Sequence, residues 1–484
     1  MLSIDQMRGD YYDRFRPELT RGLGRLIERG AFFTDAHHDH AITETAPGHA
    51  TLLSGRFPRN TGIVRNSAGV VSLDWPLHGS PDSGAAPFRF RGTTLADWMQ
   101  AADRATRVLS VSAKDRSAIL MVGREKHPVF WYANNGTFTN STWYGPALPE
   151  WVEAFNRRRL AHAWAGTQWD VLPGGVYSES DSVPQEHRGV DYTFPHRFSA
   201  DPDAAARQLR RTPMMDELTL ALAWAGVREL DLGGGNRTDL LAISLSATDY
   251  VGHDYGPASR EQHDNLRRLD RVLGGFLDSL FALRDSTRIV FAISADHGVT
   301  PIPELSGSRK VDQRPAVRAA RNLVRQRGGD PAAVVFDEGA IFVNPARLGP
   351  DTATGPIADA FLDAARGIAG IVRAERFSAV SAARNPDEVT RRWQQMFSGA
   401  DAPVAVLTIA PGNGWASSTS TANHGSPHRA DSHVPLVLVG APFTPGRIAR
   451  FVRTVDLAPT LAAALGIRPL ETLDGVVLRD ALKR

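Results

Sequence analysis

Carboxylate and imidazole side chains follow three apolar runs of the sequence, and both residue types can bind metal ions. Asp5 follows LSI, Asp249 and His253 follow DLLAISLSA, and Asp296 and His297 follow TRIVFAISA. Taken singly, an Asp in such a place more often caps a turn. Their recurrence after successive runs predicts a shared metal site.

The sequence contains no cysteine, so any metal must be bound by His and carboxylate side chains. A further histidine ligand is expected from the segment NHGSPHRADSHVPL, where His424, His428 and His433 are alternatives. Three His and three Asp exceed what one tetrahedral zinc ion needs, which favours two zinc ions. Two ions about 3.5–4 Å apart suit the in-line displacement of phosphoryl transfer.

The segment ETAPGHATLLSG, residues 44 to 55, places Thr45 at the start of a helix-like run. A threonine hydroxyl is a weak nucleophile, but a bound metal ion can activate it. A helix N-terminus also favours phosphate oxygens. The alternative is that Thr45 only caps the helix. Together with the predicted metal site, we interpret Thr45 as the nucleophile; His49, one turn later, either orients the site or is structural.

The elements that must position these residues are short apolar runs alternating with helical patterns. Strands are predicted at 2–4, 107–113, 239–247, 287–295, 403–410 and 433–441, and helices at 93–103, 261–283 and 455–466. The last helix has Asp456 to cap it and Gly466 to end it. This alternation predicts an α/β fold with a mainly parallel sheet sandwiched by helices.

In such sheets ligands bind beyond the carboxyl ends of the strands, where the polar residues above are expected to meet. Asp296 and His297 are adjacent, so their strand must end before them for both to reach one site. Asp249 and His253 are four residues apart in DYVGHDYG, which we interpret as an irregular turn. Lys114, Asp115 and Arg116 follow the strand predicted at 107–113 and add cations to the same edge.

Two regions interrupt this alternation within one catalytic domain, 1–484. Residues 124–205 are rich in Trp, Tyr, Asn, Gly and Pro and predict a loop-rich cap insertion. Residues 305–400 predict a small α+β insertion, with a strand pair in AAVVFDEGAIFVNP and a helix in IADAFLDAARGIA.

Composition excludes several classes of protein. Lys and Arg number 55 against 53 Asp and Glu, so no basic surface indicates nucleic-acid binding. No run of about 18 apolar residues is present, so no membrane span is predicted. The chain opens directly with MLSID. We expect an export signal upstream and a periplasmic or secreted location.

These residues together resemble the alkaline phosphatase superfamily, and within it the periplasmic alkaline phosphatases with a threonine nucleophile. Type I phosphodiesterase/nucleotide pyrophosphatases are close cousins of that group. The resemblance runs through SIDQMRGDY, TAPGHATLLSG, NTGIVRN, SAKDRSAI, TDYVGHDYGP, SADHG, HGSPHRADSHVPL and DLAPTLAAALGI, which cover nearly the whole chain.

The resemblance implies one zinc ion bound by Asp249, His253 and His424, which selects His424 among the three alternatives. It implies a second zinc ion bound by Asp5, Asp296, His297 and the oxygen of Thr45. Thr45 would form a covalent phosphothreonine, with Asn66, Lys114 and Arg116 contacting phosphate oxygens. After His424 the sequence departs from many relatives, carrying His428 and Arg429 where aromatic residues are frequent.

The expected function is hydrolysis of small-molecule phosphate monoesters with a broad range of leaving groups. A monoester dianion carries more charge on its free oxygens than a diester, so Lys114 and Arg116 favour monoesters. The alternative for this pair is a surface ion pair with Asp115. Two alternative functions are a phosphodiesterase or nucleotide pyrophosphatase on the same scaffold, and a non-catalytic phosphate- or metal-binding protein. The sequence does not determine the oligomeric state; a monomer is the simplest expectation.

Overall fold

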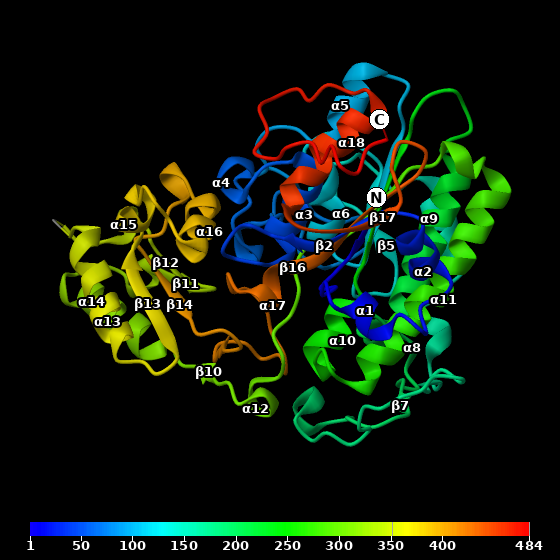
Figure 1. Ribbon diagram of the computed structural model, residues 1–484. Coiled ribbons are helices and arrows are strands. Elements are labelled where there is room, and N and C mark those ends of the chain that lie inside the picture. The colour runs from blue at the N-terminus through cyan, green and yellow to red at the C-terminus, as the bar shows by residue number, and fades with distance from the viewer. Residues whose placement is uncertain (351, 484) are drawn as a thin grey trace.

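The computed structural model describes residues 1–350 and 352–483, and a nine-stranded sheet forms the centre of the molecule (Figure 1). From one edge to the other its strands are β17 (Gly446–Arg453), β2 (Ala31–His37), β16 (His433–Val439), β9 (Phe291–Ser294), β1 (Leu2–Ile4), β8 (Leu240–Leu245), β3 (Val108–Ser112), β4 (Val129–Tyr132) and β5 (Phe138–Thr139).

The five strands from β9 to β4 run parallel, so their carboxyl ends meet at one edge. β16 runs antiparallel to both of its neighbours, β9 and β2. The sheet is therefore mixed but mostly parallel, and the predicted fold class is confirmed.

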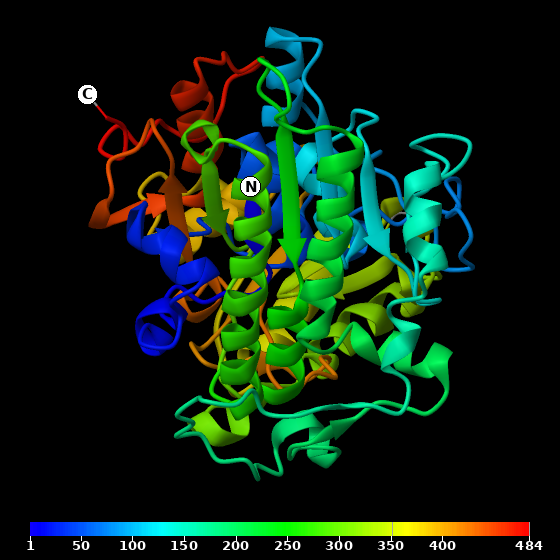
Figure 2. The same ribbon diagram turned by 90° about the vertical axis from the view of Figure 1, so that its right-hand side faces the viewer.

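Helices cover both faces of this sheet (Figure 2). Side chains of β3 pack on both faces of the sheet. Leu109 and Val111 belong to one hydrophobic core, together with α2 (Gly22–Glu28), α9 (Met214–Glu229) and α11 (Arg260–Leu283). Val108 enters the other core, with α3 (Thr45–Ser54), α5 (Leu95–Ala102), α6 (Asp115–Val122) and α18 (Leu457–Leu465). Because successive side chains of a strand point to opposite faces, apolar runs such as this one suit a sheet buried on both sides.

The helices predicted at 93–103, 261–283 and 455–466 are present as α5, α11 and α18. Gly466 ends α18 as predicted, in the left-handed conformation. Asp456 lies at the N-cap of α18 as predicted, but its side chain makes no cap hydrogen bond to this helix. The carboxylate instead accepts from the backbone N–H groups of Arg453 and Val476, which ties two loops together.

A smaller lobe carries its own four-stranded sheet, at the left of Figure 1. Its strand order is β11 (Val334–Asp337), β12 (Ala340–Val343), β14 (Ala405–Ile409) and β13 (Ile371–Arg376), and α13 (Arg314–Gln326) and α14 (Thr354–Arg366) pack on it. The strand predicted at 403–410 therefore belongs to this lobe and not to the central sheet. Apolar pattern identifies a strand but does not say which sheet it joins.

The segment predicted as a cap begins with a strand of the central sheet, since β4 pairs parallel with β3. The rest of it consists mainly of loops with the short helices α7 (Glu150–Arg157) and α8 (Pro202–Leu209). Four strands of the central sheet, β2, β4, β5 and β17, were not predicted. β17 is an exposed edge strand that alternates with arginine, so it lacks the apolar run of a buried strand.

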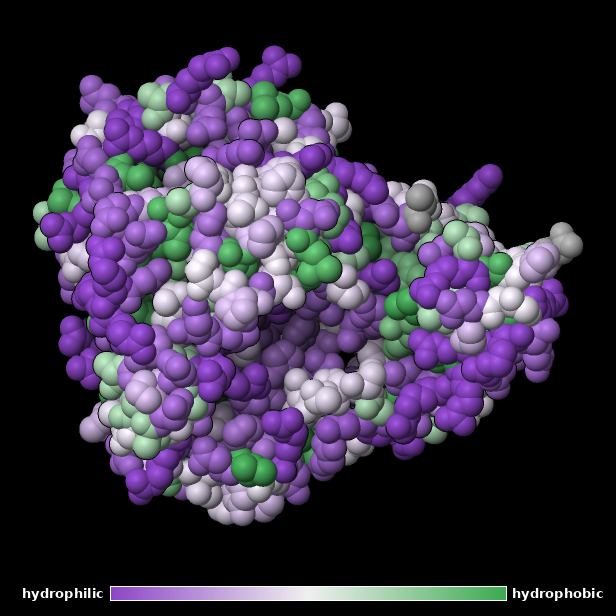
Figure 3. Space-filling model, turned by 180° about the vertical axis from the view of Figure 1, so that it is seen from behind, coloured by the Kyte–Doolittle hydropathy of each residue, from purple (hydrophilic) through white to green (hydrophobic). Residues whose placement is uncertain are grey.

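No helix among the described residues is both long and apolar enough to cross a bilayer. Figure 3 shows the opposite side of the molecule, where a hollow walled mainly by hydrophilic residues opens between the main body and the smaller lobe. His424 of the body and Glu338 and Trp415 of the lobe line one small cavity, so the lobe borders the region described next.

Candidate active site

The carboxyl ends of the parallel strands bring the predicted polar residues together. Asp5 follows β1 directly and is fully buried, and its N–H donates to Leu245 O at 2.9 Å, the last bond between β1 and β8. β9 ends at Ser294, two residues before Asp296, as the opposed directions of Asp296 and His297 required. Both of these side chains are buried.

Asp249 and His253 lie on a helix, α10 (Ala247–Tyr255), and not on the irregular turn that was predicted. Residues four apart share one face of a helix, so both side chains still point to the same place. His253 Nε2 lies 3.3 Å from Asp249 Oδ1. The glycine in DYVGHDYG suggested a turn, but most of the segment is buried as a helix that packs against α11 and α9.

Thr45 is the first residue of α3, and Glu44 occupies the cap position without a side-chain cap hydrogen bond. The Thr45 hydroxyl lies 3.4 Å from His297 Nε2. The helix approaches this closely because Gly48 has no side chain: a Cβ there would lie 2.1 Å from the Asp296 carbonyl oxygen. Thr45 is thus 1% exposed and directed at the imidazole, in contrast to the capping alternative.

Two groups of metal-ligand atoms share His297. Asp5, Asp296 and His297 form one group and Asp249, His297 and His424 form the other, with the ligand atoms of each within 4.8 Å of one another. His297 Nε2 lies 3.6 Å from Asp5 Oδ1 and 3.4 Å from Asp296 Oδ2. His424 Nε2 lies 3.7 Å from Asp249 Oδ1.

His297 and His424 of these groups, and the neighbouring His253, all use the same ring nitrogen for a backbone hydrogen bond. The Nδ1–H groups of His253, His297 and His424 point to the carbonyl oxygens of Ala422, Gly298 and Thr43, at 2.9, 2.9 and 2.8 Å. Such bonds fix the tautomer and leave Nε2 as a lone-pair donor, as in metal-binding histidines. The Nε2 atoms are the ones directed at the carboxylates.

The competing histidines lie elsewhere. His428 Nε2 contacts Ile409 O at 2.7 Å, and His433 Nε2 contacts Thr34 O at 2.9 Å. His433 also stacks on His37. Of the three alternatives, the structure brings only His424 to Asp249.

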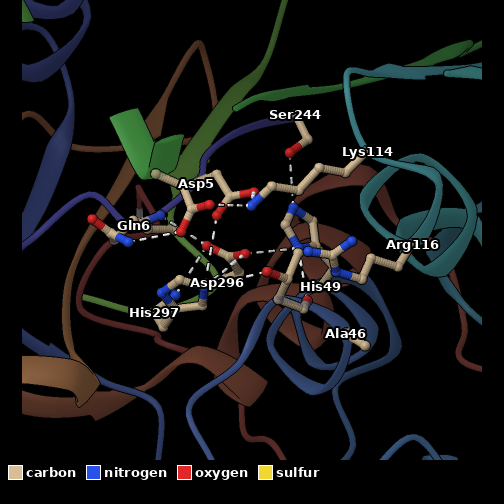
Figure 4. A network of polar contacts seen from close by, with 12 residues as sticks. Asp5, Gln6, Ala46, His49, Lys114, Arg116, Ser244, Asp296 and His297 are labelled. Carbon is tan, nitrogen blue, oxygen red and sulfur yellow. Dashed lines mark hydrogen bonds and ion pairs between the residues drawn. The ribbon is translucent and has the colours of Figure 1, made fainter. Parts of the chain in front are cut away.

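Lys114 is 3% exposed, and its ammonium lies between the two groups. Its Nζ is 2.7 Å from Asp5 Oδ2 and 2.5 Å from Asp249 Oδ2 (Figure 4). Burial alone would lower its pKa, but the two carboxylates raise it, so the ammonium stays charged. The alternative of a surface pair with Asp115 is wrong for Lys114; Asp115 lies 3.6 Å from Arg116 instead.

The electrostatics of the carboxylates favour added positive charge. Burial raises the pKa of Asp5, and the neighbouring Asp296 raises it further. Burial opposes ionisation of Asp249 as well, but Lys114 and His253 lower its pKa overall. Asp5 Oδ1 is buried without a hydrogen-bond donor among the described residues, and Asp296 Oδ2 faces only the imidazoles of His49 and His297 there. Three buried carboxylates beside one ammonium, with free Nε2 atoms facing them, fit divalent cations.

Asn66 begins a short 3₁₀ helix, Asn66–Ala68, that lies beside the start of α3. Its amide oxygen accepts from Ala46 N at 2.8 Å, and its own N–H donates to Glu44 Oε2 at 2.7 Å. These bonds orient the amide so that its NH₂ group is the part available to a ligand. Arg116, the second residue of α6, is partly buried near the same edge.

Sequence reasoning gave no role to two buried residues here, Gln6 and Glu44. Glu44 places Asn66, and Gln6 contacts two of the carboxylates. Their only sequence signal was adjacency to Asp5 and Thr45.

His49 was left open between an orienting and a structural role. Its Nδ1 lies 2.9 Å from Thr45 O and 3.1 Å from Asp296 Oδ2, and its Nε2 lies 2.9 Å from Ser244 Oγ. It therefore connects α3 to two strand ends.

Comparison with known proteins agrees with this geometry. The family model described as type I phosphodiesterase / nucleotide pyrophosphatase matches residues 1–427, so the chain belongs to that family. Alkaline phosphatase PhoK of Sphingomonas sp. is 29% identical over 98% of this chain and 89% of its own. Alkaline phosphatase PhoV of Synechococcus elongatus is 29% identical over 100% and 92%.

Among solved structures, the crystal structure of alkaline phosphatase PafA superposes with a TM-score of 0.91 at 25% identity, covering 100% of this chain and 98% of the other. Murine ectonucleotide pyrophosphatase/phosphodiesterase 5 reaches 0.59 at 15% identity and shares the fold. The predicted superfamily and the predicted class of enzyme, an alkaline phosphatase, are confirmed.

Proposed function

We propose that the protein is a two-zinc phosphate monoester hydrolase that acts through a covalent phosphothreonine at Thr45. One observation carries the proposal: Thr45 meets two carboxylate–imidazole groups and the buried cation Lys114 at one edge of the sheet. The alkaline phosphatase relatives over nearly the full chain support the reaction class.

Asp249, His253 and His424 would hold one zinc ion, and Asp5, Asp296, His297 and the Thr45 hydroxyl the other. When bound, the ions supply Lewis acidity that lowers the pKa of the Thr45 hydroxyl and stabilises charge on the phosphoryl group. The chain itself fixes the attacking oxygen, since Gly48 seats α3 against Asp296 and His49 ties Thr45 to the same carboxylate. Attack by Thr45 Oγ1 on phosphorus would form the phosphothreonine and break the bond to the leaving alcohol. Water would then hydrolyse the phosphothreonine, which releases inorganic phosphate and restores the Thr45 hydroxyl.

The side chains around the reacting group select the substrate. The Asn66 amide would donate to one free phosphate oxygen, while Lys114 and Arg116 face the others with positive charge. A monoester presents more charge to these donors than a diester, and charge-assisted hydrogen bonds are about twice as strong as neutral ones. Because binding rests on the phosphate, we expect a broad range of leaving groups.

The proposal is tested by comparing kcat/KM for p-nitrophenyl phosphate and bis-p-nitrophenyl phosphate on zinc-loaded protein. A strong preference for the monoester is expected. The alternative is the activity that the description of the family model names, a phosphodiesterase or nucleotide pyrophosphatase. Preference for the diester would establish that alternative and contradict the roles given to Lys114 and Arg116.

Thr45→Ala separates catalysis from binding. Removal of the nucleophile should lower kcat by about a thousandfold or more, since nucleophilic residues dominate such reactions. Bound zinc, measured by elemental analysis, should change little because the carboxylates and histidines remain. Unchanged hydrolysis by the variant would rule out the phosphothreonine route, and a wild type without hydrolysis would indicate a binding protein.

We also propose a periplasmic or secreted location, which suits a chain without thiols. Fractionation of the native host followed by activity assay tests it. Activity confined to the cytoplasmic fraction would contradict this location.

A further inference from the structure

Gln6 occupies a strained position directly after Asp5. The N–H of Met7 donates to Ile4 O at 3.1 Å, which closes a tight turn with Asp5 and Gln6 at its centre. Gln6 has φ 65°, a left-handed conformation that glycine or asparagine adopts far more readily in such turns. Its side chain is completely buried. A side chain that is retained at such a position needs an explanation from its contacts.

Those contacts reach both groups of candidate metal ligands, and Figure 4 shows Gln6 close to Asp5 and Asp296 of one group. The Gln6 N–H donates to Asp296 Oδ1 at 3.0 Å, and its Nε2 donates to Asp249 Oδ1 at 2.7 Å. Asp296 belongs to the group with Asp5, and Asp249 belongs to the group with His424. Gln6 therefore connects one carboxylate of each group through two separate hydrogen bonds.

The two bonds depend on different parts of Gln6. The bond to Asp296 comes from the backbone and requires only the turn. The bond to Asp249 comes from the side chain and fixes the carboxylate from one side, while Lys114 holds its other oxygen at 2.5 Å. A substitution that removes the side chain should thus affect Asp249 and spare Asp296.

Packing against α10 holds the Gln6 amide in place. A Cβ added to Gly252 would lie 1.8 Å from Gln6 Oε1, so the helix that carries Asp249 and His253 rests directly on this amide. Gly252 precedes His253 and follows Asp249 by three residues. Any change in the amide therefore reaches both of these residues through one short segment of helix.

We propose that Gln6 is a positioning residue that sets the Asp249 carboxylate, and thereby the affinity for the metal ion of the Asp249, His253 and His424 group. This inference rests on the proposed two-zinc function. Hydrogen-bond partners of metal ligands typically change affinity by about ten- to a hundredfold.

The test uses Gln6→Gly, since glycine keeps the turn and the backbone N–H but removes the amide. Zinc-loaded wild type and variant are titrated with a chelator, and released zinc and the melting temperature are measured together. We expect one of the two ions to leave the variant at about ten- to a hundredfold lower chelator concentration, with the second ion released as in the wild type. The variant His253→Ala identifies which ion is affected, because it should lose early the same zinc ion as Gln6→Gly.

Gly252→Ala is the matched variant, because it displaces the amide while leaving Gln6 chemically intact. Alone it should weaken the same ion, but in the Gln6→Gly background its effect should largely disappear. Such non-additivity is the signature of a direct contact.

Release of both ions at equally lowered chelator concentration, with a lower melting temperature of the chelated protein, would show a general structural role and overturn the inference. Unchanged release of both ions would also overturn it. A wild type that binds fewer than two zinc ions would contradict the proposed function itself, and this inference would fall with it.

Discussion

At the residue scale, the two cationic side chains of the site, Lys114 and Arg116, differ in burial and in their ion-pair partners. Lys114 is buried between Asp5 and Asp249, so removing it would disturb the carboxylates as well as the substrate. Arg116 is only partly buried, and its guanidinium lies 3.6 Å from the carboxylate of Asp115. Arg116 is therefore the better probe of substrate charge.

We predict that Arg116→Ala lowers kcat/KM for p-nitrophenyl phosphate by about ten- to a hundredfold, the worth of a hydrogen bond to a charged group. The value for the bis-ester should change much less, because a diester presents less charge to Arg116. The measurement is the ratio of the two kcat/KM values, with Arg366→Ala on the exposed surface of the lobe as a control. Equal losses for both esters would contradict a role in selecting monoesters.

At the element scale, α10 must begin where β8 ends for Asp249 to reach the site. Asp216 of α9 helps to set this start, since its Oδ1 accepts from Ala247 N at 3.0 Å. Its Oδ2 has no hydrogen-bond partner among the described residues. Burial raises the pKa of Asp216 to about 7, so the folded protein holds this proton far more tightly than the unfolded chain.

The sign of the effect on stability follows from this shift. An acid whose pKa is raised by folding destabilises the protein progressively as pH rises from about 4 to about 7, with no further change above. Asp216→Asn removes the charge and keeps an acceptor for Ala247. We predict that the variant matches the wild type in free energy of unfolding near pH 4 and exceeds it near pH 8, by at most about 4 kcal/mol. Urea unfolding at both pH values measures this; a gain of equal size at both would contradict the assigned pKa.

At the scale of the whole molecule, the site joins segments that are distant in the sequence. Residues near the start, middle and end of the chain supply the candidate metal ligands, and the smaller lobe adds the end of β11. There, Asp337 contacts Ser67 and lies 3.7 Å from Arg65. Metal binding should therefore stabilise the global fold and not one loop alone.

We predict that chelation of zinc lowers the melting temperature in a single cooperative transition. A ligand present at a thousand times its Kd stabilises the folded state by about 4 kcal/mol. Differential scanning calorimetry of loaded, chelated and zinc-restored protein measures the shift. A melting temperature that does not respond to chelation would contradict the location of the ions at this junction.

The ligand types, their order along the chain and their places after β1, β8 and β9 could be read from the sequence. This was possible because buried parallel strands leave a recognisable apolar run and ligands gather where such runs end. The position of the proposed nucleophile was also predictable, since Thr45 begins a helix next to those ends. The same pattern gave the α/β class and most of the helices that cover the sheet.

Tertiary structure alone decided the rest. The structure places the strand at 403–410 in the lobe and shows that the segment with Asp249 and His253 is a helix. It also brings His424 to Asp249, in agreement with the choice that the family resemblance implied. It also revealed Gln6 and Glu44, whose roles consist entirely of hydrogen bonds to residues remote in sequence or across a turn. The local sequence pattern indicates whether a residue is buried and which secondary structure it adopts. Its hydrogen-bond partners are determined only when distant segments of the chain fold together.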